Sequence, residues 1–143
     1  MSLKLAKTFI SSIRGNADLN QLLGADADGK GARIFTVARP ESDENEDRIP
    51  YLVVLPESIQ SEGNKDGYRG TDTVTIGLLC VASTFFELIE LTELVQEAVE
   101  SIEAEQDGYY INDFTFSANA VQMDTLKPCY YQTLTYIVNI QKA

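Results

Sequence analysis

The residues of this chain best suited to bind phosphate lie near its start, in the stretch GADADGKG at positions 24–31. Gly24, Gly29 and Lys30 match most of the pattern G-x-x-x-x-G-K, in which backbone amides and a lysine surround the phosphates of a nucleotide. Gly31 stands where the pattern needs Ser or Thr, a helix rather than a strand is predicted ahead of it, and two aspartates inside the loop would repel phosphate. We therefore expect a flexible connector here and no nucleotide.

Patterns for metal binding and catalysis are also incomplete. Asp26 and Asp28 begin the spacing of a calcium loop, but Lys30 stands where the third ligand belongs. The chain has no histidine, which removes the commonest general base and metal ligand. Its two cysteines, Cys80 and Cys129, lie far apart without zinc-type spacing, and Cys80 lies in an apolar strand pattern, where a thiol behaves as a small hydrophobic group. We expect no enzyme, no cofactor and no metal site.

Charge is the most uneven property of the sequence. The formal net charge is −11, with 22 acidic and 11 basic residues. No basic residue occurs between Arg69 and Lys127, although half of the acids lie there, so this one segment carries the whole net charge. Such a surface is either simply solvated, or it faces a basic partner or a passage for another polyanion. Direct binding of nucleic acid by this segment is disfavoured, because contacts to phosphates need Lys and Arg.

The centre of the acidic segment is predicted to be an amphipathic helix at residues 84–103. At 100° per residue its apolar side chains form one stripe: Leu88, Leu91, Val95, Ala98, Val99 and Ile102. The opposite side is acidic: Glu87, Glu90, Glu93, Glu97 and Glu100. Thr84 and Glu87 fit a capping box, and Asp107-Gly108 fits a stop signal. Like charges three or four residues apart cost roughly 0.2–0.5 kcal/mol per pair, so tertiary packing must hold this helix.

Apolar alternation predicts the other elements. Residues 3–13 form a first helix and residues 18–23 a short second one, with Asp18 or Asn16 as its cap. Five strands are predicted at residues 32–38, 51–55 (ended by Pro56), 72–82, 109–117 and 130–140. In the fourth, Tyr110, Phe114 and Phe116 are expected on one side. We predict a single α+β domain, residues 1–143, with one mostly antiparallel sheet of four to five strands and two main helices packed on one face.

Two features of this predicted domain indicate assembly. Residues 57–71 form a polar loop longer than ordinary connections, in which Tyr68 and Arg69 are of the types enriched at protein contacts. The sheet face away from the helices carries Leu79, Val81 and Ile137, with either Leu52 or Val54, and nothing in the chain is predicted to cover it. An apolar second face indicates burial against another subunit. No apolar run of membrane-spanning length and no secretory leader is present, so we expect a soluble protein.

The order of these elements resembles that of one known group. The leading helix, the strand Ile-Pro-Tyr-Leu-Val-Val at 49–54, the strand Thr-Val-Thr-Ile at 73–76 running into the helix, and the final Leu-Thr-Tyr-Ile-Val at 134–138 resemble tail-terminator (tail-completion) proteins of long-tailed phages, often encoded by prophages. The likeness covers most of the chain. It departs at Leu78-Leu79-Cys80, where many relatives have Trp or another aromatic residue. A neck or head-completion protein therefore stays open as an alternative.

This resemblance implies a structural role in virion assembly. In that family a small α+β subunit forms a hexameric ring that caps the finished tail tube, stops its growth and offers a docking face to the head. The expected partners are other copies of the chain, the tail tube protein and a head or neck protein, first in the host cytoplasm and then in the virion tail or neck, with no membrane contact. DNA would pass through the bore without being specifically bound.

The resemblance also assigns roles to particular residues. Glu90, Glu93, Glu97 and Glu100 would line or flank the bore, or face a partner. The loop around Tyr68 and Arg69 would contact the tube protein or the neighbouring subunit. The alternative from a different class is an acidic adaptor, which mimics nucleic acid or captures a basic partner through the same glutamates.

Overall fold

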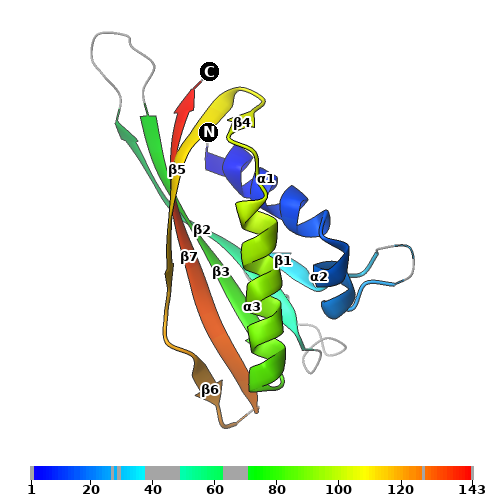
Figure 1. The fold of residues 1–143 in the computed structure, drawn as a ribbon. Coiled ribbons are helices and arrows are strands. Elements are labelled where there is room, and N and C mark those ends of the chain that lie inside the picture. The colour runs from blue at the N-terminus through cyan, green and yellow to red at the C-terminus, as the bar shows by residue number, and fades with distance from the viewer. Residues whose placement is uncertain are drawn as a thin grey trace.

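The fold is α+β, as predicted. A computed structural model describes residues 2–26, 28, 30–37, 49–62, 71–126 and 128–142. Within these residues it has three helices: α1 (Ser2–Arg14), α2 (Ala17–Leu22) and α3 (Phe85–Glu100). Its strands are β1 (Ile34–Thr36), β2 (Tyr51–Glu62), β3 (Thr71–Ala82), β4 (Glu105–Gln106), β5 (Tyr109–Ala118), β6 (Gln122–Asp124) and β7 (Cys129–Lys142). Figure 1 shows α1 and α3 side by side on one face of a curled sheet, as expected.

The sheet is larger than the predicted four to five strands, and it is mixed. The strand order is β1-β2-β3-β7-β5-β4, and β6 also pairs with β7. The pair β1–β2 is parallel, whereas the other pairs are antiparallel. The strands β4 and β6 have two and three residues, which is too short for an alternating pattern to be visible in a sequence. The expectation of a small, mostly antiparallel sheet was therefore wrong in size and in the pairing of its β1 edge.

The strand β2 does not end at Pro56, contrary to the prediction. It continues to Glu62 beside β3, with a register shift between Pro56 and Ser58 that places a bulge at Glu57. Gly77 makes room for this bulge, because a Cβ atom there would lie 2.6 Å from Glu57 Oε1. Residues 57–62 of the predicted polar loop thus belong to a hairpin arm, which extends beyond the helices in Figure 1. The sequence-predicted residues Tyr68 and Arg69 lie outside the described residues.

The core lies between the helices and the even-numbered residues of β3 and β7. The predicted stripe of α3 is buried from Leu88 to Val99, Ile102 is partly buried, and Thr92 joins the buried set. From the sheet come the buried side chains Val74, Ile76, Leu78, Cys80, Leu134, Tyr136, Val138 and Ile140. Phe9 of α1 packs between the rings of Phe114 and Tyr136, at centroid distances of 6.2 and 5.8 Å. Apolar burial on one face therefore holds α3 in place despite its charge.

A bulge also changes the predicted face of β5. Ile111 pairs with Ile140 and Asp113 with Asn139, so Asn112 has no partner in the register. The shift places Tyr110 on the face away from the helices, whereas Phe114 and Phe116 lie on the helix side. The prediction that all three aromatics share one side was wrong, because a bulge reverses the alternation of side chains.

The start of α3 follows the prediction and its end does not. Thr84 is the N-cap, and its Oγ1 accepts a hydrogen bond of 3.1 Å from the Glu87 amide. The Glu87 carboxylate reaches back to the Ser83 amide at 2.9 Å, one residue before the expected partner. The helix ends at Glu100, ahead of Asp107-Gly108, which instead forms the turn between β4 and β5, with Gly108 at φ +90°.

The N-cap gives a direct test of how α3 is held. We expect Thr84→Ala to lower the free energy of unfolding by about 1 kcal/mol, because the Glu87 amide loses its acceptor at the helix start. Thr84→Ser, which keeps the hydroxyl, is the matched control. Urea denaturation followed by circular dichroism measures both. Equal midpoints for the Ala and Ser variants would show that the cap contributes nothing.

Candidate assembly surfaces

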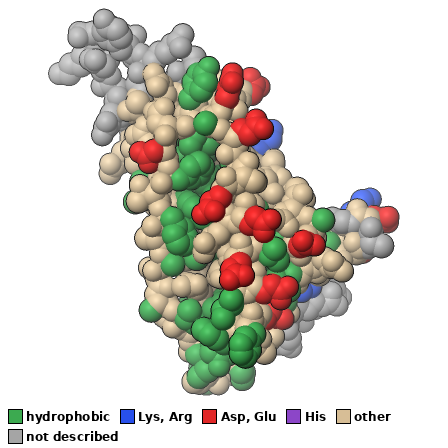
Figure 2. All heavy atoms as spheres, viewed as in Figure 1, with side chains coloured by type: hydrophobic (Ala, Val, Ile, Leu, Met, Phe, Trp, Pro, Cys, Tyr) green, Lys and Arg blue, Asp and Glu red, His purple; other side chains and the backbone are tan. Residues whose placement is uncertain are grey.

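The outer face of α3 is an exposed acidic stripe. Measured from Phe86, the residues Glu90, Glu93, Glu97 and Glu100 all lie within about 40° of one line along the helix. All four glutamates are exposed, and no ion pair to a basic side chain is recorded for them among the described residues. Figure 2 shows acidic side chains over this part of the surface and few basic ones. The predicted residues thus form one continuous surface, opposite the buried stripe.

The same line begins with an apolar tip that sequence reasoning did not single out. Phe86 is 82% exposed, and Phe85 and Ile89 are exposed beside it. Phe85 meets the rings of Phe86 and of Tyr130 in β7 edge-on, with centroid distances of 6.4 and 6.2 Å. A green patch lies at the lower end of the molecule in Figure 2, where α3 begins. The sequence could have predicted this exposed tip, because Phe86 precedes Glu90 by one helical turn and so lies on the glutamate side of the helix.

The predicted subunit-facing residues lie together on the sheet face away from the helices. Leu79 pairs with Val53, and Val81 with Tyr51, on the same side as Ile137. Val81 and Val53 are buried, at 4% and 3% exposed, so the expectation that nothing in the chain covers this face was wrong at their end of it. Ile137 is 40% exposed, so the face is open there. The sequence expectation of Leu52 or Val54 on this face was wrong, because the β2–β3 register pairs them with the helix-side residues Cys80 and Leu78. The β2 residue on this face is Val53.

The outer face of α1 is basic, in contrast to that of α3. Lys4, Lys7 and Arg14 are exposed along it, and no acidic residue occurs in the helix. Lys7 and Arg14 border a groove of about 450 Å³ between α1 and the strands β1 and β2. The other residues lining this groove are mainly apolar: Ala6, Ile10, Ser11, Thr36, Val37, Val54 and Pro56. The two main helices thus present opposite charges outward from one layer.

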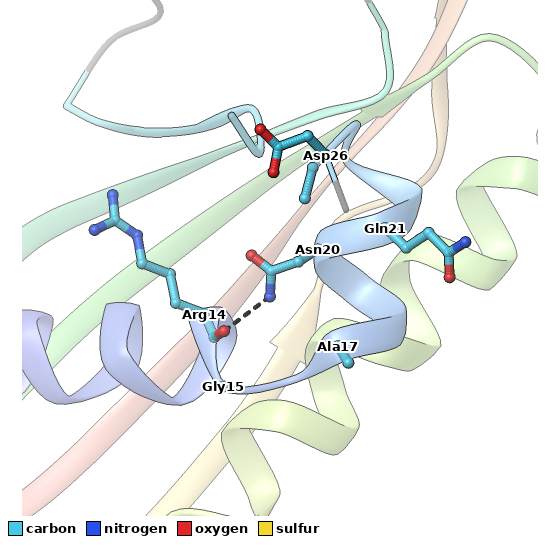
Figure 3. Close-up of a pocket in the computed structure, with 7 residues that line it drawn as sticks. Arg14, Gly15, Ala17, Asn20, Gln21 and Asp26 are labelled. Atoms are coloured by element: carbon cyan, nitrogen blue, oxygen red, sulfur yellow. Dashed lines mark hydrogen bonds between the residues drawn. The ribbon is translucent and has the colours of Figure 1, made fainter. Parts of the chain in front are cut away.

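A second pocket of about 450 Å³ lies where α1 turns into α2, and its polar groups are structural (Figure 3). Asn20 is buried, and its Nδ2 donates to the carbonyl oxygens of Ile13, Arg14 and Asn16 at 2.6–3.0 Å. Asp26 Oδ1 accepts from the amides of Asp28 and Lys30, each at 2.9 Å. The Asn20 bonds supply a donor to the free carbonyl groups at the end of α1. The Asp26 bonds hold the connector in a turn before Lys30. The Asn20 and Asp26 side chains of this pocket therefore serve the local fold.

The buried titratable groups likewise belong to the core. Burial raises the pKa of the Cys80 thiol, and burial followed by the charge of Glu100 raises the pKa of Tyr136. The Tyr136 hydroxyl is buried without a hydrogen-bond partner among the described residues. The described part of the chain has no group of three or more His, Cys, Asp or Glu side chains arranged to hold a metal ion. Every helix within it is too short or too polar to span a lipid bilayer.

Comparison with known proteins identifies the fold. No family model matches the sequence, and no curated protein matches it. Among solved structures, the chain is similar to one in the virion of a native gene transfer agent particle, with a TM-score of 0.60 and 14% identity. The match covers 96% of this chain and 94% of that chain. At this identity the likeness concerns the fold alone, and it extends over the whole domain.

The two thiols give a test of the packing beneath these surfaces. Both cysteines are free; Cys80 is fully buried and Cys129 is partly exposed. We expect a thiol reagent to modify one cysteine in the folded protein and two after denaturation. Burial and the charge of Asp124 raise the pKa of Cys129, so its reaction rate should keep rising above the ordinary cysteine pKa. Cys129→Ser should abolish the native reaction and Cys80→Ser should leave it unchanged. Two thiols reacting at equal rates in the folded protein would contradict the burial of Cys80.

Proposed function

We propose that this protein is a non-enzymatic structural subunit of a phage-like particle, and more specifically a tail terminator. In this role about six copies form a ring that caps the tail tube, stops its growth and presents a docking face to the head. The observation that carries the proposal is the fold, which matches a chain of a gene transfer agent virion from end to end. The tail-terminator role rests on the sequence resemblance, in which the leading helix, the two strands, the following helix and the final strand occur in the order found in tail terminators.

The surfaces of the molecule suit such a ring. The acidic stripe of α3 would line or flank the passage, where like charge lets DNA slide instead of binding it. The segment that joins β2 to β3 in the sequence, with Tyr68 and Arg69, would contact the tube protein or the neighbouring subunit. The open part of the far sheet face, with Leu79 and Ile137, would face another subunit, with Val81 buried beneath it. Assembly would take place in the host cytoplasm, and the mature site would be the virion tail or neck.

Two alternatives use the same observations differently. A neck or head-completion protein would also be a virion subunit, but it would bind the head portal instead of the tube end. An acidic adaptor would use Glu90, Glu93 and Glu97 to capture a basic protein, with affinity that falls as salt is added. The acidic adaptor is favoured by one observation, which is that the glutamate stripe is exposed and has no basic partner among the described residues.

The ring itself is the first prediction of this proposal. We expect mass photometry and light scattering of the purified chain to show a closed assembly of about six 15.8 kDa subunits, and negative-stain images to show a ring. Addition of purified tail tube should place the ring at one tube end and stop tube growth. A chain that stays monomeric at high concentration and does not bind tube ends would contradict the proposal.

The passage is the second prediction. Replacing Glu93, Glu97 and Glu100 by Lys should leave the ring mass unchanged, because these side chains are exposed. The same change should make the ring retain double-stranded DNA, with an affinity that falls steeply with salt, because lysines contact phosphates. Replacement by Gln is the matched control and should give weaker retention than Lys. Loss of the ring in the Gln variant would place these residues in a subunit contact instead of the passage.

A further inference from the structure

We propose that the apolar tip of α3 in one copy of the chain docks into the groove between α1 and the strands β1 and β2 of the next copy. The inference rests on the proposed self-assembly and identifies the surfaces that would carry it. The tip is Phe86 with Phe85 and Ile89, and the groove is the one bordered by Lys7 and Arg14.

The tip has the composition of a contact and not of a solvated helix end. Phe86 exposes 82% of its surface, and Ile89 is exposed one turn further along the same face. Large apolar side chains in adjacent exposed positions mark interaction sites, and aromatic residues are enriched at their centres. Phe85 is partly covered by Tyr130 at 6.2 Å, so the base of the tip is anchored on the sheet while Phe86 projects from it. The tip is therefore preorganised.

The groove offers a matching surface. Its volume of about 450 Å³ lies in the range of clefts that enclose small ligands or a few side chains. Ala6, Ile10, Val54 and Pro56 give it an apolar lining, and Ile10 and Val54 connect that lining to the core. An apolar side chain that entered this groove would leave water for a largely apolar wall.

Charge selects a second copy of the chain as the occupant. Glu87 and Glu90 lie beside the tip, and Lys7 and Arg14 border the groove. Glu90, Lys7 and Arg14 are exposed and have no ion pair among the described residues, so their charges are open to a neighbour. The Glu87 carboxylate accepts hydrogen bonds from the Ser83 amide and hydroxyl, and adds negative charge beside the tip. An apolar centre with opposite charges at its rim is the arrangement that fixes partner and orientation at protein contacts.

Backbone strain at Val37 points to the same groove. Val37 has φ +68°, a left-handed conformation that is unfavourable for a β-branched residue, and its amide donates to the Val54 carbonyl at 3.0 Å. This conformation leaves Val37 71% exposed at the groove. A strained residue lowers stability, and packing elsewhere must offset that cost. Such residues cluster at binding and active sites, where the conformation serves a function. A contact to the next copy would cover this side chain and explain its position.

The proposed contact is head-to-tail. The tip and the groove are different surfaces of the same chain, so each copy would use its tip toward one neighbour and its groove toward the other. Such a contact produces a ring when the rotation closes and a filament when it does not. It also leaves the part of α3 around Glu97, about 16 Å from Phe86, outside the groove and available to line the passage.

Two variants, each with substitutions at exposed residues on one side of the contact, test it without disturbing the core. Phe86→Glu removes the tip, and a glutamate in the first turn of α3 is favoured by the helix dipole. Lys7→Glu combined with Val37→Asp blocks the groove, and Asp tolerates positive φ better than Val. We expect each variant to lower the assembled fraction at least tenfold in mass photometry, with unchanged circular dichroism. Val121→Glu, which likewise replaces a partly exposed apolar side chain by a charged one, is the matched control elsewhere on the surface and should assemble as the wild type does.

Mixing the two variants is the decisive measurement. The Phe86→Glu protein keeps an intact groove and the Lys7→Glu/Val37→Asp protein keeps an intact tip, so an equimolar mixture should form dimers of about twice 15.8 kDa and nothing larger. If the wild type assembles and either variant assembles equally well, or the mixture stays monomeric, this contact is overturned and the ring proposal stands. A variant that keeps its self-assembly and loses only tube binding would assign the tip to the tube protein and also overturn it. A wild type that self-associates neither alone nor at tube ends overturns both proposals.

Discussion

The packing of the apolar stripe of α3 against β3 and β7 is the interaction on which the rest of this structure depends. Only Ser83 and Thr84 separate the end of β3 from the start of α3, so the helix must turn back along the strand it follows. Leu88, Leu91, Val95 and Val99 then meet the even-numbered residues of the sheet, and each buried side chain of this size contributes roughly 1.5–3 kcal/mol. This burial outweighs the repulsion among the glutamates, and it fixes which side of the helix faces outward.

The contact between α1 and α3 has a second consequence, which is the separation of charge. The helices meet through small polar residues, since the Ser12 hydroxyl donates to the carbonyl of Ala98 and lies 3.4 Å from the Ser101 hydroxyl. Neither the lysines of α1 nor the glutamates of α3 take part in this contact. One layer therefore presents a basic face and an acidic face in different directions, which is the asymmetry that a head-to-tail assembly needs.

The same apolar packing explains how this chain can share its fold with a virion chain at only 14% identity. The fold requires an apolar stripe on each helix and alternating apolar residues on the central strands, and many sequences meet that requirement. The surfaces are under no such constraint from the fold. The surface of this chain carries the glutamate stripe, the aromatic tip and the strained Val37 at a groove with a basic border, and the proposed role draws on these features.

The sequence by itself determined the features that depend on residues close together in the chain. The helical periods, the buried stripe of α3, the Thr84 cap and the alternation in β3 and β7 all follow from local spacing, and the glutamate face is simply the other side of that stripe. Only the tertiary structure decided what depends on pairing between distant residues. The bulges at Glu57 and Asn112, the parallel β1 edge and the place of Val53 on the far sheet face are set by register, which leaves no periodic signal. The groove arises in the same way, because α1, β1 and β2 build it from residues up to 50 positions apart, and no local pattern can bring them together.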